Sequence, residues 1–145
     1  MEVSRGMNIL AEEKGISFTI NTDDSMPKIK FDKDKISQVL TNLLSNAIKF
    51  TDKGGIIVTT ERDDNVVHVT IEDTGYGIQV ENVPKLFEAF KQLNGGTGKK
   101  KGGTGLGLVI AKEIILEHNG KMWVESQFGK GSKFHFTLPI KERRD

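Results

Sequence analysis

The clearest pattern in the chain is a run of apolar residues at helical spacing between positions 36 and 48. Apolar residues recur there at intervals of three and four positions, which places them on one face of a helix. The residues of this face are Ile36, Val39, Leu40, Leu43, Leu44, Ala47 and Ile48. Asp32 or Asp34 can cap the start of the helix, and Lys53-Gly54-Gly55 ends it.

Further helices and a set of strands follow from the same patterns. Helical spacing predicts helices over Val3–Lys14 and Leu106–Glu117 and a short one over Pro84–Lys91. Asn119-Gly120 is expected to form the C-cap of the helix that ends at Glu117. Alternation of apolar and polar residues predicts strands at Ile16–Asn21, Ile29–Phe31, Ile56–Arg62, Val66–Asp73, Met122–Ser126 and Phe134–Leu138. The sum is an α+β protein with about three helices over a largely antiparallel sheet.

Composition excludes several classes of protein and agrees with the predicted α+β fold. A chain of 145 residues has the length of one domain. The absence of cysteine excludes disulfides and thiolate metal sites. With 21 basic and 20 acidic residues, the charge balance argues against a general binder of nucleic acid or acidic membranes. No apolar run approaches the roughly 18–20 residues that span a bilayer, and the first residues lack the core of a signal peptide.

Glycine is concentrated in one segment: seven of the 16 glycines fall between positions 95 and 107. Residues 94–105 are too polar and glycine-rich to pack a core, and we expect them to be mobile. Where Gly103–Gly107 meets the predicted helix, free backbone N–H groups can form an anion site, with Lys99–Lys101 just upstream; the alternative is a flexible surface loop. A dinucleotide fingerprint fits poorly because Leu108 stands where its third glycine belongs, and a Walker loop fails because Lys100 follows Gly98-Lys99.

A polar stripe accompanies the apolar face of the long helix. Asn42, Asn46 and Lys49 are spaced i, i+4, i+7, so their side chains stack on one face. An ordinary solvated helix face is one interpretation. The other interpretation is a ligand site. Asparagine is a poor helix former, so two of them on one face need another reason. An amide oxygen can ligate Mg²⁺, and a lysine can bind phosphate as a point charge.

Asp73 ends the strand that begins at Val66. Val67, Val69 and Ile71 share one phase of this strand and Asp73 continues it, which predicts an inward-pointing carboxylate. A buried carboxylate is costly unless hydrogen-bond donors meet it. Asp73 can therefore be a turn residue that caps the Gly75–Gly77 loop, or a carboxylate that accepts from the amino group of adenine. The sequence leaves both interpretations open.

Taken in order, these segments resemble the ATP-binding catalytic domain of sensor histidine kinases, in the family that also holds DNA gyrase and the ninety-kilodalton heat-shock chaperone. The resemblance runs from about Ile16 to Leu138 and rests on five motifs in family order. They are an N box (Asn42–Thr51), a first glycine box (Asp73–Gly77), an F box (Phe87 and Phe90), a second glycine box (Gly103–Leu108) and a last glycine motif (Gly129–Phe134).

The resemblance implies a two-layer sandwich of the Bergerat type, with about five mostly antiparallel strands on three helices, that binds ATP and Mg²⁺. It implies that Asn46 chelates Mg²⁺, that Asn42 supports phosphate or metal, that Lys49 touches phosphate, and that Asp73 reads adenine. The other implied nucleotide contacts are Phe50, Gly75, Gly77, Ile78, Phe90, Gly103, Thr104, Gly105, Leu106, Gly107, Leu108, Ser132 and Phe134. Residues 92–105 would form a lid braced by Phe87 and Phe90.

Two departures from the family pattern bear on whether the domain transfers phosphate to histidine or hydrolyses ATP. Relatives that hydrolyse ATP carry a glutamate where this chain has Asn42, and an amide has no basicity near pH 7. The family's arginine after the F box is replaced by Gln92, so charge stabilisation of the transferring phosphoryl group would fall to Lys91 or Lys99–Lys101. Transfer to histidine is therefore favoured. An ATP hydrolase, a serine kinase of the same family and a nucleotide-binding docking module without transfer stay as alternatives.

The acceptor histidine of such a kinase lies on a separate helical hairpin. Such a histidine is followed by an acidic residue on an amphipathic helix. His68 and His135 instead lie in predicted strands and are expected to point outward. His118 lies at a helix end, where a cation suits the dipole. We therefore expect residues 15–140 to be the catalytic domain alone, with 1–14 the tail of a connecting helix and 141–145 a solvated tail. The expected partners are the hairpin and a response regulator. The domain is expected to be cytoplasmic and monomeric when isolated, to bind no nucleic acid and not to insert into a membrane itself; a membrane anchor elsewhere in the full-length protein stays open.

Overall fold

The computed structural model describes residues 2–22, 32–63, 65–79, 81 and 106–140. Within these ranges the chain forms the helices α1 (Glu2–Lys14), α2 (Lys33–Lys49) and α3 (Leu106–Glu117). The same ranges contain the strands β1 (Ser17–Thr22), β2 (Gly55–Asp63), β3 (Val66–Asp73), β4 (Lys121–Gln127) and β5 (Gly131–Pro139). This confirms the predicted sandwich of three helices on a mixed five-stranded sheet.

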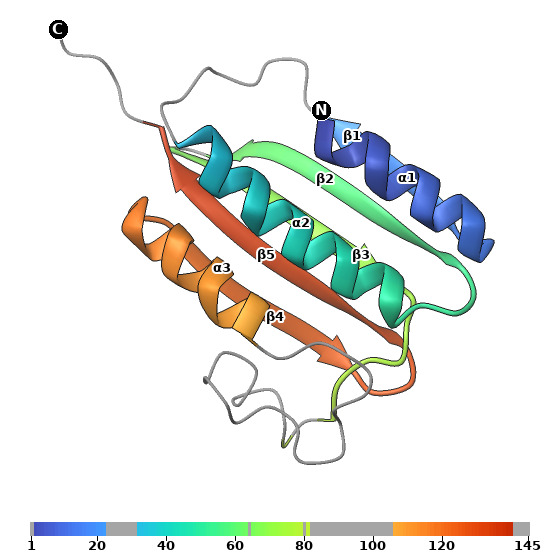
Figure 1. The fold of residues 1–145 in the computed structure, drawn as a ribbon. Coiled ribbons are helices and arrows are strands. Elements are labelled where there is room, and N and C mark those ends of the chain that lie inside the picture. The colour runs from blue at the N-terminus through green and yellow to red at the C-terminus, as the bar shows by residue number, and fades with distance from the viewer. Residues whose placement is uncertain (1, 23–31, 64, 80, 82–105, 141–145) are drawn as a thin grey trace, which may run out of the picture.

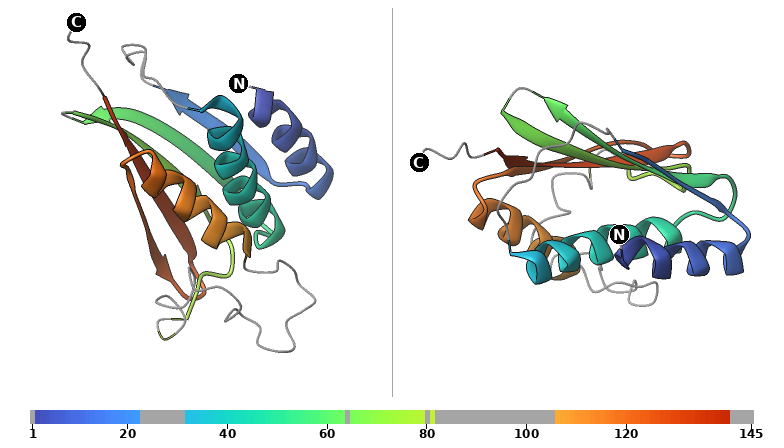
Figure 2. Two further views of the ribbon diagram at one scale, coloured as in Figure 1. Left: turned by 60° about the vertical axis from the view of Figure 1, so that its left-hand side comes forward. Right: turned by 90° about the horizontal axis from the view of Figure 1, so that it is seen from above.

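The sheet has the strand order β1-β2-β3-β5-β4. Its only parallel pair among the described strands is β1 with β2, and the long helix α2 lies between those two strands in the chain. A parallel pair needs such a crossover, whereas a hairpin is enough for the antiparallel pairs β2–β3 and β4–β5. All three helices cover the same face of the sheet (Figure 2).

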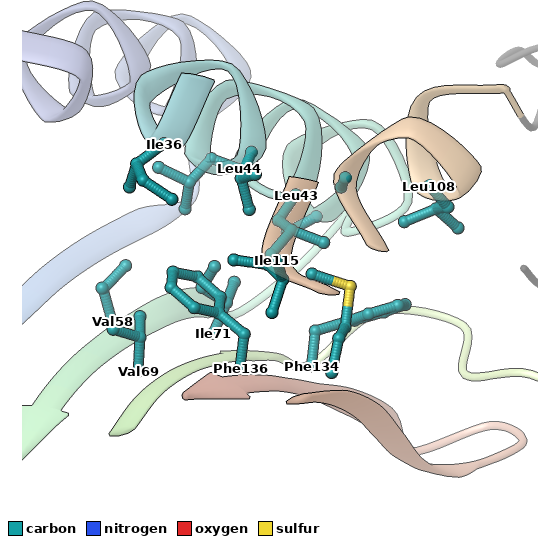
Figure 3. Close-up of a cluster of buried hydrophobic side chains, with 14 of the residues drawn as sticks. Ile36, Leu43, Leu44, Val58, Val69, Ile71, Leu108, Ile115, Phe134 and Phe136 are labelled. Carbon is teal, nitrogen blue, oxygen red and sulfur yellow. The ribbon is translucent and has the colours of Figure 1, made fainter. Parts of the chain in front are cut away.

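The core fills the layer between the helices and that face. Alternate residues of β3 are buried, as are the apolar faces of α2 and α3. Figure 3 shows side chains from both layers pointing toward one another, among them Leu43 of α2, Ile115 of α3 and Phe136 of β5. Each of these three is at most 1% exposed, which is the close packing expected of a protein interior.

The start of α2 is capped by Asp32, one of the two predicted residues. The Asp32 side chain accepts a hydrogen bond from the backbone N–H of Lys35 at 3.1 Å. Asp34 instead lies in the first turn, where a negative charge suits the helix dipole.

After α3, it is Asn119 rather than glycine that takes the left-handed conformation, with φ of 65°. Gly120 is required for a different reason: a Cβ there would lie 1.9 Å from the backbone oxygen of Thr137.

His118 lies at the end of α3 and forms hydrogen bonds through both ring nitrogens. Its Nδ1–H donates to the carbonyl of Ile114 at 2.9 Å, and its Nε2 accepts from the backbone N–H of Asp32 at 3.1 Å. His118 therefore joins the end of α3 to the start of α2 by hydrogen bonds, which is a structural role.

Two predicted elements, the strand Ile29–Phe31 and the helix Pro84–Lys91, lie outside the described residues. None of the helices that the structure describes is both long and apolar enough to cross a membrane.

Candidate functional site

The motif residues that the structure describes gather at one end of the molecule. The C-terminal ends of α2 and β3, the start of α3 and the hairpin between β4 and β5 all lie there (Figure 1). The sheet brings them together: Asp73, the last residue of β3, pairs with Ile56 on one side and with Ser132 on the other.

Asp73 points inward, as its phase in the strand predicts, and only 7% of it is exposed. One carboxylate oxygen, Oδ1, accepts the backbone N–H of Gly75 at 2.8 Å, and the backbone N–H of Ser132 also donates to the carboxylate. Burial raises the pKa of Asp73 above its ordinary value. The two backbone donors oppose the shift, and the charge of Glu72 adds to it. The predicted turn role is thus confirmed, and the carboxylate keeps further capacity to accept hydrogen bonds.

The loop after Asp73 is held between α2 and the β4–β5 hairpin. Tyr76 N–H donates to the carbonyl of Phe50 at 3.2 Å, and Gly129 N–H donates to the carbonyl of Tyr76 at 2.6 Å. Gly77 has φ of 77°, and a Cβ there would lie 2.2 Å from the carbonyl oxygen of Gln127. Glycine at position 77 therefore allows both the positive φ and the close approach of the β4–β5 hairpin.

Ser126 is a site residue that the sequence patterns did not single out. Its Oγ accepts the backbone N–H of Ile78 at 2.8 Å, lies 2.8 Å from Ser132 Oγ and donates to the carbonyl of Gly131 at 3.1 Å. This one hydroxyl connects the loop after Asp73 to the strand pair β4–β5. A signal was available, since Ser126 continues the inward phase of Met122 in β4 just as Asp73 does in β3.

Thr51 carries the one buried side-chain oxygen in the described part of the chain that has no hydrogen-bond partner. The residue is fully buried, and its Oγ1 would lie 3.0 Å from a Cβ built on Gly75. An orphaned buried hydroxyl costs about 1–3 kcal/mol. A polar atom in this setting suits a site where a bound water or a ligand atom completes the hydrogen bonding.

The polar stripe of α2 leads toward the same end. Asn42 and Asn46 are partly buried and Lys49 is exposed in the last turn. Among the residues that the structure describes, no three or more His, Asp or Glu side chains group so that they could hold a metal ion. A cation here would depend on amide oxygens and on the ligand's own oxygens.

The remaining predicted residues divide into core and undescribed positions. Phe134 and Leu108 are buried in the core and Ile78 packs against it. Phe50 is partly buried after the end of α2. Leu106 and Gly107 form the start of α3. The others lie outside the described residues: Phe87, Phe90, Lys91, Gln92, Lys99–Lys101, Gly103, Thr104 and Gly105.

The two strand histidines belong to a separate cluster on the face of the sheet away from the helices. His135 Nδ1 is 2.9 Å from His68 Nε2, and His135 Nε2 donates to Glu125 Oε1 at 2.9 Å. The indole of Trp123 stacks on His135 with ring centroids 4.8 Å apart. Both nitrogens of His135 are therefore engaged, and only 8% of the residue is exposed.

Comparison with known proteins gives one family. Residues 31–142 match the family described as histidine kinase-, DNA gyrase B-, and HSP90-like ATPase. The sensor histidine kinase WalK of Bacillus subtilis (strain 168) is 37% identical over 94% of this chain and 23% of WalK. Hybrid signal transduction histidine kinase B of Dictyostelium discoideum is 42% identical over 88% of this chain and 7% of its own length. The chain thus spans less than a quarter of each of these relatives.

Solved structures agree on the fold. Full-length ShkA in complex with AMPPNP superposes with a TM-score of 0.85 at 31% identity, covering 99% of this chain and 30% of ShkA. The nucleotide-free catalytic domain of the histidine kinase ThkA superposes with a TM-score of 0.79 at 35% identity, covering 97% of this chain and 94% of that domain. The ThkA chain, which is described as a catalytic domain, thus has nearly the same length as this chain.

Proposed function

Because the chain belongs to the family of histidine kinase-, DNA gyrase B- and HSP90-like ATPases, we propose that it is the ATP-binding catalytic domain of a two-component sensor histidine kinase. It binds Mg-ATP and transfers the γ-phosphoryl group to a histidine on a separate helical hairpin. Support comes from the relatives, since WalK and the Dictyostelium protein are both named histidine kinases.

The observation that carries the proposal is the buried carboxylate of Asp73. Two backbone donors, from Gly75 and Ser132, fix the carboxylate at the end of β3. In the proposed complex it accepts a hydrogen bond from the exocyclic amino group of adenine. Guanine presents a carbonyl oxygen at that position, which would face the carboxylate without a proton between them. The orphaned Thr51 Oγ1 beside the loop fits a site completed by the base or by a water bound with it.

The phosphate end of the site is assigned to the polar stripe of α2. Asn46 ligates Mg²⁺ through its amide oxygen, Asn42 supports the metal or a phosphate, and Lys49 meets phosphate as a point charge. When bound, Mg²⁺ neutralises charge that develops on the phosphate oxygens. We assign the backbone N–H groups of Gly103–Gly107 to the phosphates and charge stabilisation of the transferring group to Lys91 or Lys99–Lys101, with Gln92 as a further phosphate contact.

Hydrolysis is the main competing function, and Asn42 disfavours it. An amide cannot accept a proton from water near pH 7, so this position offers no general base. For transfer, the attacking nitrogen and any base that assists it come from the separate hairpin. The names of WalK and of the Dictyostelium protein favour neither a serine kinase nor a docking module without transfer.

The wider system follows from the same proposal. The partners are the hairpin and a response regulator, the domain acts in the cytoplasm, and residues 15–140 form the catalytic domain. The chain's own histidines are not the acceptors, which agrees with the hydrogen bonds that engage both nitrogens of His118 and of His135.

The decisive experiment incubates the protein with γ-labelled ATP and Mg²⁺, with and without a purified hairpin that carries the acceptor histidine. We expect acid-labile label on the hairpin and none on this chain. The same incubation with the Asp73→Asn variant is the matched negative control and should give no label on the hairpin. Label released as inorganic phosphate without the hairpin would indicate a hydrolase. Nucleotide binding without transfer or hydrolysis would indicate the docking module.

A further inference from the structure

One lysine of α1 reaches the C-terminal end of α2. Lys14 Nζ donates to the carbonyl of Ile48 at 2.6 Å and to the carbonyl of Lys49 at 3.0 Å. The last four carbonyls of a helix lack a partner within the helix, and a cation there suits the negative end of the helix dipole. Lys14 thus stabilises the helix turn that carries Lys49, although it lies 34 residues before Ile48 in the sequence.

The same ammonium group also reaches the loop that follows Asp73. Lys14 Nζ lies 3.5 Å from Asp52 Oδ1, and the other oxygen of Asp52 accepts a hydrogen bond from the hydroxyl of Tyr76 at 2.5 Å. The Tyr76 hydroxyl is protonated at neutral pH and donates to Asp52, and this hydrogen bond raises the pKa of Tyr76. Lys14, Asp52 and Tyr76 therefore form a continuous polar bridge from α1 to the loop.

This bridge joins the two parts of the proposed nucleotide site. The end of α2 bears the residues assigned to phosphate, and the loop follows the carboxylate assigned to adenine. The backbone already links the two, since Tyr76 N–H donates to the carbonyl of Phe50. The polar bridge adds a third element, α1, which packs beside α2 (Figure 1) with Ala11 fully buried in the core.

We infer that Lys14 is a positioning residue: it holds the last turn of α2 and the loop after Asp73 in one relative geometry, and so couples the seating of α1 to nucleotide affinity. The inference rests on the proposed function. Lys14 does not touch the nucleotide; it acts through Asp52 and the helix carbonyls. By thermodynamic reciprocity, nucleotide binding must stabilise the docked α1 by the same factor as docked α1 strengthens binding.

The bridge is expected to matter more for the site than for folding. The side chains of Lys14 and Asp52 are 31% and 60% exposed, and ion pairs of this exposure contribute little to stability. The buried Ala11 and the neighbouring Ile16 keep α1 on the core without Lys14. Removal of the ammonium group should therefore leave a folded protein with a less well-ordered site.

The test compares Lys14→Met with Lys14→Arg, which preserves the charge and the donors, and with Lys35→Met as a matched control. Lys35 pairs with Glu117 at 4.0 Å at the opposite end of α2. Calorimetry with Mg-ATP should show affinity about fivefold weaker for Lys14→Met, the low end of usual couplings between sites, and unchanged within twofold for the other two variants. Circular dichroism checks that all three are folded.

Two further readouts separate positioning from a general loss of structure. Tyr76→Phe removes one hydroxyl from a side chain that is 47% exposed, and its effect on affinity should not add to that of Lys14→Met, because both break the same bridge. Hydrogen exchange of residues 2–14 should slow when ATP binds the unaltered protein and not when it binds Lys14→Met.

Several outcomes overturn the inference. Unaltered ATP affinity in Lys14→Met would do so, as would additive effects of Lys14→Met and Tyr76→Phe, or equal slowing of exchange in α1 with and without Lys14. If Lys14→Met does not fold, unaltered ATP affinity in Tyr76→Phe overturns it. Failure of the unaltered protein to bind ATP at all would instead remove the proposed function and this inference with it.

Discussion

The two ends of α2 solve the same physical problem in opposite ways. At the N-terminal end, Asp32 caps the helix through the backbone N–H of Lys35, three residues away. At the C-terminal end, Lys14 donates to two carbonyls from another helix, and Tyr76 donates to the carbonyl of Phe50 from a loop. The N-terminal end is completed mainly by its own sequence neighbours, whereas at the C-terminal end distant segments add to the local hydrogen bond from Thr51 N–H to the Ile48 carbonyl.

The difference separates stability from function. The proposed nucleotide contacts lie toward the end that distant segments complete, because a site needs groups from several elements to converge on one ligand. The end that a local cap completes holds none of the residues assigned to the nucleotide. Substitutions at the two ends should therefore affect different measurements.

The largest effect is expected from Asp73→Asn. Loss of a charged hydrogen-bond acceptor costs about 1.5–3 kcal/mol, so ATP affinity should fall by roughly 10- to 100-fold and the preference over GTP should disappear. The amide oxygen of asparagine can still accept from Gly75, so the fold should persist. Because burial raises the pKa of Asp73, its removal should not lower the free energy of unfolding of the empty protein. Competitive binding and urea unfolding measure the two quantities.

The pH dependence should follow from the same carboxylate. Burial raises the pKa of Asp73 above 3.8, and adenine binding requires the ionised form. Adenosine affinity should fall as pH drops through this raised pKa, by about tenfold per pH unit below it. The effect on stability has the opposite sign, because the folded protein binds this proton more readily than the unfolded chain: the Asp73 contribution to stability declines as pH rises from 3.8 through the raised value.

Titration calorimetry with adenosine, which has no phosphate group to titrate, checks the binding prediction. Asp73→Asn is the control and should show weak binding that is flat across the same pH range. Affinity of the unaltered protein that stays constant to well below the ordinary pKa of aspartate would contradict it.

A smaller effect is expected from Asn46→Ala. Loss of one amide ligand should weaken Mg-ATP by about tenfold, equal to about 1.4 kcal/mol, and leave metal-free ATP unchanged within twofold. Calorimetry with and without Mg²⁺ measures the difference. Ser45→Ala is a neighbouring control, since the Ser45 hydroxyl bonds to the carbonyl of Asn42 within the helix. Equal losses with and without the metal would argue against a metal ligand.

The smallest effect is expected at the other end of the helix. Asp32→Ala should lower the free energy of unfolding by about 1 kcal/mol through loss of the cap, and leave ATP affinity within twofold of the unaltered value. Asp34→Ala is the matched control, because it removes a charge from the first turn without removing the cap. A loss of affinity in Asp32→Ala comparable to that in Asn46→Ala would refute the separation between the two ends.

Local patterns were enough to predict much of the architecture. The spacing of apolar residues predicted α2 and α3, and the predicted range Leu106–Glu117 matches α3. Strand phase predicted that Asp73 points inward, and it is 7% exposed. These predictions succeed because helix and strand periods act over a few neighbouring residues, and because a polar residue in a buried phase is unusual enough to notice.

Long-range contacts decided the rest. Ser126 joins Ile78 across 48 positions, Lys14 reaches Ile48 across 34, and His118 accepts from Asp32 across 86. No periodicity encodes such pairs, because their partners become neighbours only when the sheet and helices have assembled. The sequence therefore determined which segments form helices and strands and which carboxylate is buried. The tertiary structure decided which backbone groups remain to be satisfied at each helix end, and which distant side chains satisfy them.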